Sequence, residues 1–254
     1  METKTLINNE IYNSLGDRWY TAHDDPVALL RKESAVKISW VLSKISECTE
    51  KSGLKLLDVG CGGGFLTNRV SEENFEVHGL DISEESLRIA RRYDLRKKVN
   101  YVAGDAYNLP YADESFDVVS SMDFLEHVER PEEVVKEISR VLKPGGLFFF
   151  HTFNRNWVAY IVIIKFVEWF VKNTPKHMHL LRLFIKPIEL KNMCQRHAMM
   201  TKEFVGVRPL FSTITLRSLF TGIVPVGFAF KLTKSLHLSY LGYAVKQPET
   251  AVST

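Results

Sequence analysis

Leu56-Leu57-Asp58-Val59-Gly60-Cys61-Gly62-Gly63-Gly64-Phe65 is the stretch that decides the fold class of this chain. An apolar run carrying a carboxylate is followed by four glycines within five positions, and a helical pattern begins directly afterwards. Glycine adopts backbone dihedrals that are closed to other residues, and it lets a ligand approach the main chain closely. The stretch therefore predicts a strand, a ligand-binding turn and a helix in succession.

A dinucleotide is the first ligand to consider for this turn, because Gly60-x-Gly62 opens the nicotinamide fingerprint. The third glycine of that fingerprint would fall at Phe65, however, and Asp58 favours a cationic ligand over a pyrophosphate. A nucleoside with a positively charged tail fits these residues better. We expect Asp81, at the end of the next apolar run, to bind ribose hydroxyls and Asp105 to accept from an adenine amino group. Helix capping by Asp81 and loop capping by Asp105 are the structural alternatives.

The flanking sequence alternates short apolar runs with helical patterns, which is typical of a parallel sheet with crossover helices. The expected strands are Lys55–Val59, Val77–Leu80, Tyr101–Gly104, Phe116–Ser120 and Gly146–His151, with Phe204–Arg208 and Leu238–Lys246 as a closing pair. The expected helices are Ile11–Ser46, Leu66–Glu73, Glu84–Tyr93 and Pro131–Leu142, the last ended by Pro144-Gly145-Gly146. We also expect Trp19 and Tyr20 to form a lid.

These motifs resemble, in order, those of the class I S-adenosylmethionine-dependent methyltransferases. The resemblance covers about residues 55–150 and includes Gly79-Leu80-Asp81, Gly104-Asp105-Ala106 and Ser115-Phe116-Asp117-Val118-Val119. It implies an α/β, Rossmann-like, seven-stranded sheet whose last strand is antiparallel, with helices on both faces and a helical N-terminal cap. We expect one domain over 1–254: the cap over 1–50, a cofactor core over 51–153, an acceptor- or membrane-facing insertion over 154–203 and a sheet-closing part over 204–254.

The resemblance implies S-adenosylmethionine as cofactor and methyl transfer from its sulfonium by in-line displacement. In that resemblance Arg31, Gly60, Asp81 and Met122 correspond to cofactor-contacting positions, and Arg31 would meet the methionine carboxylate. The full predicted cofactor set is Arg31, Asp58, Gly60, Cys61, Gly62, Asp81, Ile82, Asp105, Ala106 and Met122.

The stretch Met122–Val128 follows the fourth predicted strand, at the edge of the sheet where ligands bind. Asp123, Glu126 and His127 are the predicted catalytic residues. They could hold Mg²⁺ or another divalent cation that lowers the pKa of a bound phenol, or His127 alone could accept the phenolic proton. A structural role for the three residues at the sheet edge is the third alternative.

Together with residues 152–157 and 184–190, this stretch resembles the ubiquinone-biosynthesis O-methyltransferases, which methylate polyprenylated catechols and hydroxyphenols. The resemblance implies O-methylation of an apolar, polyprenylated quinone precursor. Trp157–Val171, thirteen of whose fifteen residues are apolar, is too short to span a bilayer. It predicts either an interfacial helix at an anionic membrane surface or a buried helix over the acceptor pocket.

Composition narrows the remaining function classes. The chain has 254 residues and a net charge of +3, but residues 172–246 carry twelve Lys or Arg against two acidic residues, which favours an anionic partner surface. Three unpatterned cysteines and no secretory pattern over 1–10 favour a cytoplasmic protein. Together with the basic residues, the apolar segment Trp157–Val171 favours a peripheral position on the inner face of a membrane. The alternatives are a methyltransferase for another lipid or small metabolite, a nucleic-acid modifier, which we do not favour, and a non-catalytic cofactor-binding scaffold.

Overall fold

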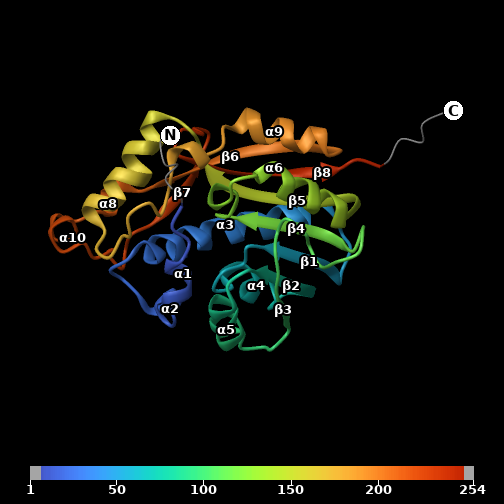
Figure 1. Cartoon of the computed structure of the whole chain (residues 1–254), viewed down its shortest axis with the longest axis horizontal. Helices are drawn as coiled ribbons and strands as arrows, with labels where there is room; N and C mark the ends of the chain where they lie inside the picture. Colours follow the sequence, from blue (N-terminus) through green and yellow to red (C-terminus); the bar gives the residue numbers. More distant parts are fainter. Residues whose placement is uncertain (1–6, 249–254) are drawn as a thin grey trace, which may run out of the picture.

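Eight strands form one mixed sheet in the computed structural model, which describes residues 7–248 (Figure 1). Their order across the sheet is β3-β2-β1-β4-β5-β8-β6-β7. The strands are β1 Leu54–Val59, β2 Phe75–Asp81, β3 Val99–Ala103, β4 Phe116–Met122, β5 Leu142–Phe153, β6 Met199–Pro209, β7 Phe230–Thr233 and β8 Ser239–Lys246. Residues 1–6 of the stretch inspected for a secretory pattern lie outside the described residues.

Strands β1 to β5 run parallel to one another, which confirms the predicted core of the sheet. In β1 the side chains of Leu56, Leu57 and Val59 are fully buried. Parallel strands are covered by helices on both faces and therefore carry continuous apolar runs rather than alternating ones. This is why the apolar run before the glycines identifies a central strand.

The sheet closes with antiparallel strands, and its strand count corrects the predicted seven. The two late apolar runs form the predicted closing pair, and β8 lies between β5 and β6 because it pairs antiparallel with both. The additional strand is β7, which pairs antiparallel with β6 at the edge of the sheet. The residues of β7 alternate apolar and polar, as a strand does, but the strand has only four residues, which is too short a run to stand out in the sequence.

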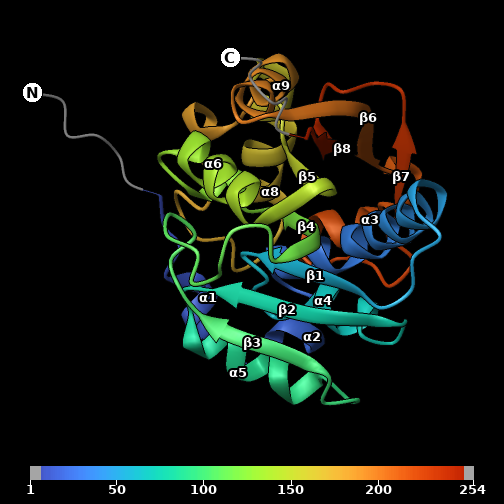
Figure 2. The same cartoon turned by 90° about the vertical axis from the view of Figure 1, so that its right-hand side faces the viewer.

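Helices cover both faces of the sheet, as predicted (Figure 2). Neighbouring residues of β5 separate the two cores, because Phe148 packs with α6 and α9 whereas Phe149 packs with α3 and α4. The helices are α1 Ile11–Ser14, α2 Arg18–Thr21, α3 Pro26–Cys48, α4 Phe65–Val70, α5 Glu84–Tyr93, α6 Pro131–Val141, α7 Trp157–Ala159, α8 Phe166–Phe170, α9 Pro187–Arg196 and α10 Leu216–Thr221. Four tighter or wider helical segments are η1 Leu125–His127, the π-helix η2 Tyr160–Lys165, η3 Leu181–Leu183 and η4 Phe211–Thr213.

The N-terminal region contains three helices where the periodicity predicts one over 11–46. Asp25 caps α3 by accepting a hydrogen bond from the Ala28 amide at 3.3 Å, and Pro26 occupies the first helical position. Gly16, with φ of 50°, separates α1 from α2. α1 lies beside the carboxyl ends of β2 and β3, so this region approaches the edge of the sheet that carries the glycine turn (Figure 2).

The motif Pro144-Gly145-Gly146 lies inside β5, which corrects its predicted role as a helix stop. α6 ends at Val141 and β5 begins at the next residue. The pairing register between β4 and β5 shifts beside this motif, and Gly145 has φ of 77°. The proline and the glycines therefore form an irregularity in the strand, and the turn from helix to strand occurs before them.

The apolar stretch Trp157–Val171 is helical, as predicted, and runs from α7 through the π-helix η2 to α8. Within residues 7–248, no helix combines the length and the apolarity that crossing a membrane requires.

Candidate active site

The glycine turn between β1 and α4 is closely covered on its ligand side. Gly60, Gly62 and Gly64 have φ of 75°, 51° and 83°, in the region that favours glycine. A Cβ atom on Gly60 would lie 2.2 Å from the Phe124 ring, and one on Gly63 would lie 2.6 Å from the Trp19 indole. The turn thus needs glycine both for its backbone conformation and for the close approach of two aromatic rings.

A cavity of about 340 Å³ opens beside this turn, at the carboxyl ends of the parallel strands. Ligands of open α/β sheets bind in that position. The structure brings ten of the predicted site residues to its wall: Asp58, Gly60, Cys61, Gly62, Asp81, Ile82, Met122, Asp123, Glu126 and His127.

Two carboxylates face the half of the cavity beside the glycines. Asp81 accepts hydrogen bonds from the amides of Gly62 at 2.8 Å and Ser83 at 2.9 Å, while burial raises its pKa. Asp58 accepts a hydrogen bond from the Ser120 hydroxyl at 2.7 Å, and burial raises its pKa to about 7. Asp81 therefore both holds the turn and presents a carboxylate to the cavity.

Three predicted cofactor residues do not line this cavity: Arg31, Asp105 and Ala106. The Arg31 guanidinium donates to the backbone carbonyls of Trp19 and Ala22, so it holds the segment after α2. Asp105 is exposed and accepts a hydrogen bond from the Tyr107 amide at 2.9 Å, which is the loop-capping alternative. Arg31 and Asp105 thus have local hydrogen-bond partners, and Ala106 packs in the apolar core.

The predicted lid is closed over the glycine turn. Trp19 is only 4% exposed, and its ring stacks on Tyr12 with 5.7 Å between centroids. The Tyr20 hydroxyl donates to the Gly63 carbonyl at 2.9 Å. Trp19 lines the cavity, and among the described residues its buried Nε1 has no hydrogen-bond acceptor.

The predicted catalytic residues find three different sets of partners. Glu126 accepts a hydrogen bond from the Thr152 hydroxyl at 2.8 Å, and burial followed by the nearby Asp123 carboxylate raises its pKa to about 7. Asp123 instead points to a separate charged group, which includes a histidine on β5. The side chains of Asp123, Glu126 and His127 therefore lie near one another without sharing one ligand position.

His127 is a neutral imidazole with a defined tautomer. Its Nδ1 lies 3.1 Å from Oδ1 of the Asn9 side chain, and because an amide oxygen only accepts, Nδ1 carries the proton. Its Nε2 then holds the lone pair and lies 3.4 Å from the Tyr12 hydroxyl. Burial lowers the pKa of His127 to about 4, so the ring is unprotonated at neutral pH.

A second imidazole, which the sequence analysis does not single out, belongs to His179. Its ring centroid lies 5.2 Å from that of His127 and 5.1 Å from that of Phe153, and it lines the cavity. Burial lowers its pKa to about 3. The sequence signal is weak, because His179 lies in irregular sequence after α8 and reaches the site only through the fold.

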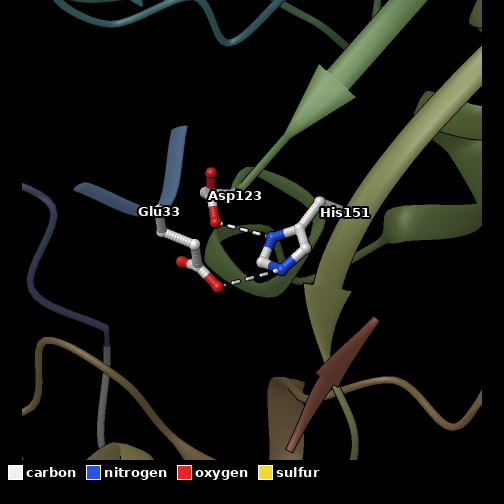
Figure 3. A group of neighbouring side chains, drawn as sticks. All are labelled: Glu33, Asp123 and His151. Atoms are coloured by element: carbon white, nitrogen blue, oxygen red, sulfur yellow. Dashed lines mark ion pairs between the residues drawn. The ribbon is translucent and has the colours of Figure 1, made fainter. Parts of the chain in front are cut away.

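A buried group of four residues, Glu33, Lys37, Asp123 and His151, forms what we call the charged floor of the cavity, and the first three line the cavity. Figure 3 shows Glu33, Asp123 and His151. His151 Nδ1 lies 2.6 Å from Asp123 and its Nε2 lies 3.4 Å from Glu33. The Lys37 ammonium contacts the same two carboxylates, Asp123 closely and Glu33 at 3.5 Å. Glu33 and Lys37 are one helical turn apart on α3, so their spacing was the signal that the sequence analysis missed.

The pKa shifts within this cluster favour the charged form of all four groups. Burial alone would lower the pKa of Lys37 and His151, but the carboxylates of Asp123 and Glu33 raise it, for His151 to about 9. Burial alone would raise the pKa of Asp123 and Glu33, but Lys37 and His151 lower it. The cluster thus holds two positive and two negative charges in compensation.

Comparison with known proteins assigns the chain to a family. A family model described as a methyltransferase domain matches residues 57–150. The ubiquinone biosynthesis O-methyltransferase of Thiobacillus denitrificans is 35% identical over 200 residues, which cover 77% of this chain and 84% of that protein. The chain belongs to the ubiquinone biosynthesis O-methyltransferase family. The protein of the same name from Yersinia pestis is 28% identical over 241 residues, covering 94% of this chain and 92% of its own.

The fold of this methyltransferase agrees with that assignment. The structure of magnesium protoporphyrin IX methyltransferase from Synechocystis with bound SAH, S-adenosylhomocysteine, matches with a TM-score of 0.59 at 15% identity, covering 87% of this chain and 85% of that one. At this identity the likeness shows the fold alone. The protein is an S-adenosylmethionine-dependent methyltransferase, and Asp81 and the glycine turn fit the nucleoside end of that cofactor.

A divalent cation does not fit the residues of this methyltransferase as they stand. The predicted ligands Asp123, Glu126 and His127 do not form a common ligand set; among the described residues, three ligand atoms that lie within 4.8 Å of one another come from Glu33, Asp123 and His151. The ammonium of Lys37 contacts both carboxylates of that trio. A divalent cation in that position would have to displace the Lys37 ammonium.

Proposed function

We propose that this methyltransferase transfers the methyl group of S-adenosylmethionine to a hydroxyl oxygen of an apolar, polyprenylated aromatic acceptor. The observation that carries the proposal is the apolar wall of the cavity beyond η1. It is lined by Leu29, Leu30, Ile38, Phe153, Ile163, Val167, Met178, Val207, Pro209, Phe230 and Leu238. A hydrocarbon chain would bury its surface against such a wall, and the names of the relatives point to the same acceptor class.

His127 is the residue that we propose as general base. His127 lines the cavity, and its unprotonated Nε2 lies 3.4 Å from the Tyr12 hydroxyl. The acceptor hydroxyl gives its proton to Nε2, and its oxygen forms the bond to the methyl carbon. The carbon–sulfur bond breaks with its electron pair on sulfur, which leaves neutral S-adenosylhomocysteine. His127 then returns its proton to solvent.

The proposal is tested by giving the purified protein S-adenosylmethionine and a set of candidate acceptors. A polyprenylated catechol should gain one methyl group on oxygen, as shown by mass spectrometry and fragmentation. A catechol without the prenyl chain is the matched control and should react far more slowly, because it leaves the apolar wall empty. Turnover of an unrelated lipid, a small metabolite or RNA in preference to the prenylated catechol would replace the proposed acceptor by that class. Binding of S-adenosylhomocysteine with no turnover of any acceptor would favour the scaffold alternative.

We also propose that the protein binds anionic membrane surfaces, where a polyprenylated acceptor resides. The segment Trp157–Val171 supports this with two faces: Ile163 and Val167 line the cavity, whereas Trp157 and Trp169 are 76% and 66% exposed. The two predicted alternatives are thus compatible: the face with Ile163 and Val167 covers the cavity, and the face with Trp157 and Trp169 is free to contact lipid.

A neighbouring element adds exposed apolar and basic side chains to the same region. α10 lies beside the end of α8, where the Lys172 amide donates to the Gly222 carbonyl at 3.0 Å (Figure 1). Phe220 on α10 is 83% exposed, and Arg217 is exposed on the same short helix. Exposed aromatic residues beside basic ones are the composition expected of a surface that binds lipid headgroups.

A further inference from the structure

The charged floor of the cavity resembles a metal site in which the ammonium of a lysine side chain stands where the metal ion would be. Glu33, Asp123 and His151 present two carboxylates and an imidazole from three separate elements, α3, the end of β4 and β5 (Figure 3). Carboxylate and imidazole are the ligands that zinc and similar ions take in proteins. The Lys37 ammonium contacts both carboxylates, so the positive charge of the group is already present.

Lys37 faces the cavity although it is almost fully buried. Its side chain is 2% exposed, and the residue belongs to the cavity wall together with Glu33 and Asp123. An ammonium has three hydrogen-bond donors. Among residues 7–248, Glu33 and Asp123 are its acceptors, so one donor is left for a group inside the cavity.

We infer that Lys37 takes the place of a divalent cation in this enzyme: held by Glu33 and Asp123, its ammonium binds the developing oxyanion of the acceptor hydroxyl. The inference rests on the proposed hydroxyl acceptor. A fixed positive charge in a site that excludes water stabilises a developing negative charge far more than the same charge in water. The oxygen that gives its proton to His127 therefore needs no metal to lower its pKa.

The arrangement of the floor explains why a lysine is retained there. Two buried carboxylates without a compensating cation would repel each other and take up a proton. His151 compensates one of them from the strand side, at 2.6 Å from Asp123. Lys37 compensates the pair from the cavity side, which is the side that the acceptor approaches.

The first test uses the wild-type protein with a chelator. Methyl transfer to the acceptor should be unchanged by EDTA and unchanged by added Mg²⁺ or Zn²⁺. Loss of activity with EDTA and its return with a divalent ion would overturn the inference, because the enzyme would then depend on a metal.

The second test removes the resident cation. Lys37→Ala leaves Glu33, Asp123 and His151 around an opened space, so this variant should bind Co²⁺ and show its visible absorption, whereas the wild-type protein should not. Binding should also raise the melting temperature of the variant. Lys37→Met, which fills the space with an uncharged chain, is the matched control and should bind no Co²⁺. Wild-type protein that binds Co²⁺ as Lys37→Ala does would contradict the inference.

Turnover completes the test. Without metal, Lys37→Ala and Lys37→Met should lose about 10²–10³-fold in kcat, the range for removing one group that stabilises an oxyanion. Wild-type kcat in Lys37→Met would overturn the proposed role, and if Lys37→Ala does not fold, Lys37→Met and the EDTA test still decide it. The Co²⁺ measurement needs no acceptor. A wild-type protein inactive on every hydroxyl therefore counts against the proposed function, while the Co²⁺ result reports on Lys37 alone.

Discussion

Asp81 and Asp105 follow neighbouring strands and are predicted to bind the same cofactor, yet the structure places them differently. Asp81 lines the cavity with its carboxylate held by two backbone amides, whereas Asp105 is exposed and caps a turn. Asp81→Ala should weaken S-adenosylhomocysteine binding by roughly 1.5–3 kcal/mol, the range for losing a charged hydrogen-bond partner. Isothermal titration calorimetry measures this change.

The matched control for this prediction is Asp105→Ala. Its affinity for S-adenosylhomocysteine should equal that of the wild-type protein, since its carboxylate does not line the cavity. Equal losses in the two variants would mean that the third strand also contributes a cofactor ligand, as the sequence resemblance implies. Unchanged affinity in Asp81→Ala would leave that residue with a capping role alone.

His127 is the residue at which the proposed proton transfer is most directly tested. His127→Ala should lower kcat by about 10²–10⁴-fold, the usual contribution of a general base, because the Nε2 lone pair is lost. The affinity for S-adenosylhomocysteine should change little. Single-turnover kinetics beside a calorimetric titration separate the two effects.

His237→Ala provides the control for His127→Ala, because His237 is exposed and lies outside the cavity wall. Its kcat should be that of the wild-type protein. If His127→Ala keeps wild-type kcat while His179→Ala loses it, the base is the second imidazole of the cavity instead of the first.

The site residues that could be predicted from the sequence are those that directly follow a strand in the chain. Asp58, Gly60 and Asp81 follow their strands directly, so sequence and strand order were sufficient to bring them to one edge of the sheet. Lys37 and His151 meet Asp123 only after α3 packs against the sheet, and neither carries a local motif. Arg31 was assigned to the cofactor by resemblance, and in the structure its guanidinium donates to two backbone carbonyls.

Among the elements, the segment formed by α7, η2 and α8 carries the clearest prediction. Trp169 is exposed, whereas Ile164 is 6% exposed and packs with Phe153 and Phe184. Trp169→Glu should therefore reduce binding to anionic liposomes in a flotation assay, because it removes an aromatic side chain from the proposed lipid contact. It should leave the melting temperature nearly unchanged, since surface substitutions cost about 0.5 kcal/mol or less.

Ile164→Glu is the counterpart within the same segment. Because it places a charge in a packed cluster, it should lower the melting temperature strongly in thermal unfolding monitored by circular dichroism. Absence of wild-type flotation at low salt would contradict the membrane proposal, and the segment would then serve as a wall of the cavity only.

Helices and strands were predictable where the pattern of apolar residues extends over many positions. The helix at 131–141 and the five parallel strands stand out because their buried faces are continuous. The strand β7 and the breaks between α1, α2 and α3 do not, because a four-residue edge strand and a capped turn leave too few residues for a period. The motif Pro144-Gly145-Gly146 was wrongly assigned to a helix end because a bulged strand uses the same residues.

For the molecule as a whole, the charged floor of the cavity is also a tie between distant parts of the chain. It joins α3 to β4 and β5, and Ser239 on β8 extends it by donating to Glu33 at 3.3 Å. Charged groups buried at such a junction stabilise the fold only while all of them keep their charge. The stability of the whole protein should therefore depend on the protonation of one residue, His151.

The pKa of His151 is raised from its ordinary value of 6.5 to about 9 in the folded protein, because the Asp123 and Glu33 carboxylates outweigh the lowering effects of burial and of the Lys37 ammonium. The folded state thus holds this proton more tightly than the unfolded chain. The stabilisation is complete below pH 6.5 and is lost as the pH rises through 9. We expect the unfolding free energy to fall by on the order of 1–2 kcal/mol between pH 7 and 9, a drop of roughly 2–8 °C in melting temperature.

The assignment of this pH dependence to His151 is tested with a neutral replacement. His151→Gln removes the titrating proton, so its melting temperature should be lower than that of the wild-type protein at pH 7 and should change less between pH 7 and 9. His237→Gln, at an exposed position, should keep the wild-type slope. Melting curves at fixed ionic strength measure all three proteins, and a wild-type slope in His151→Gln would mean that another group releases the proton.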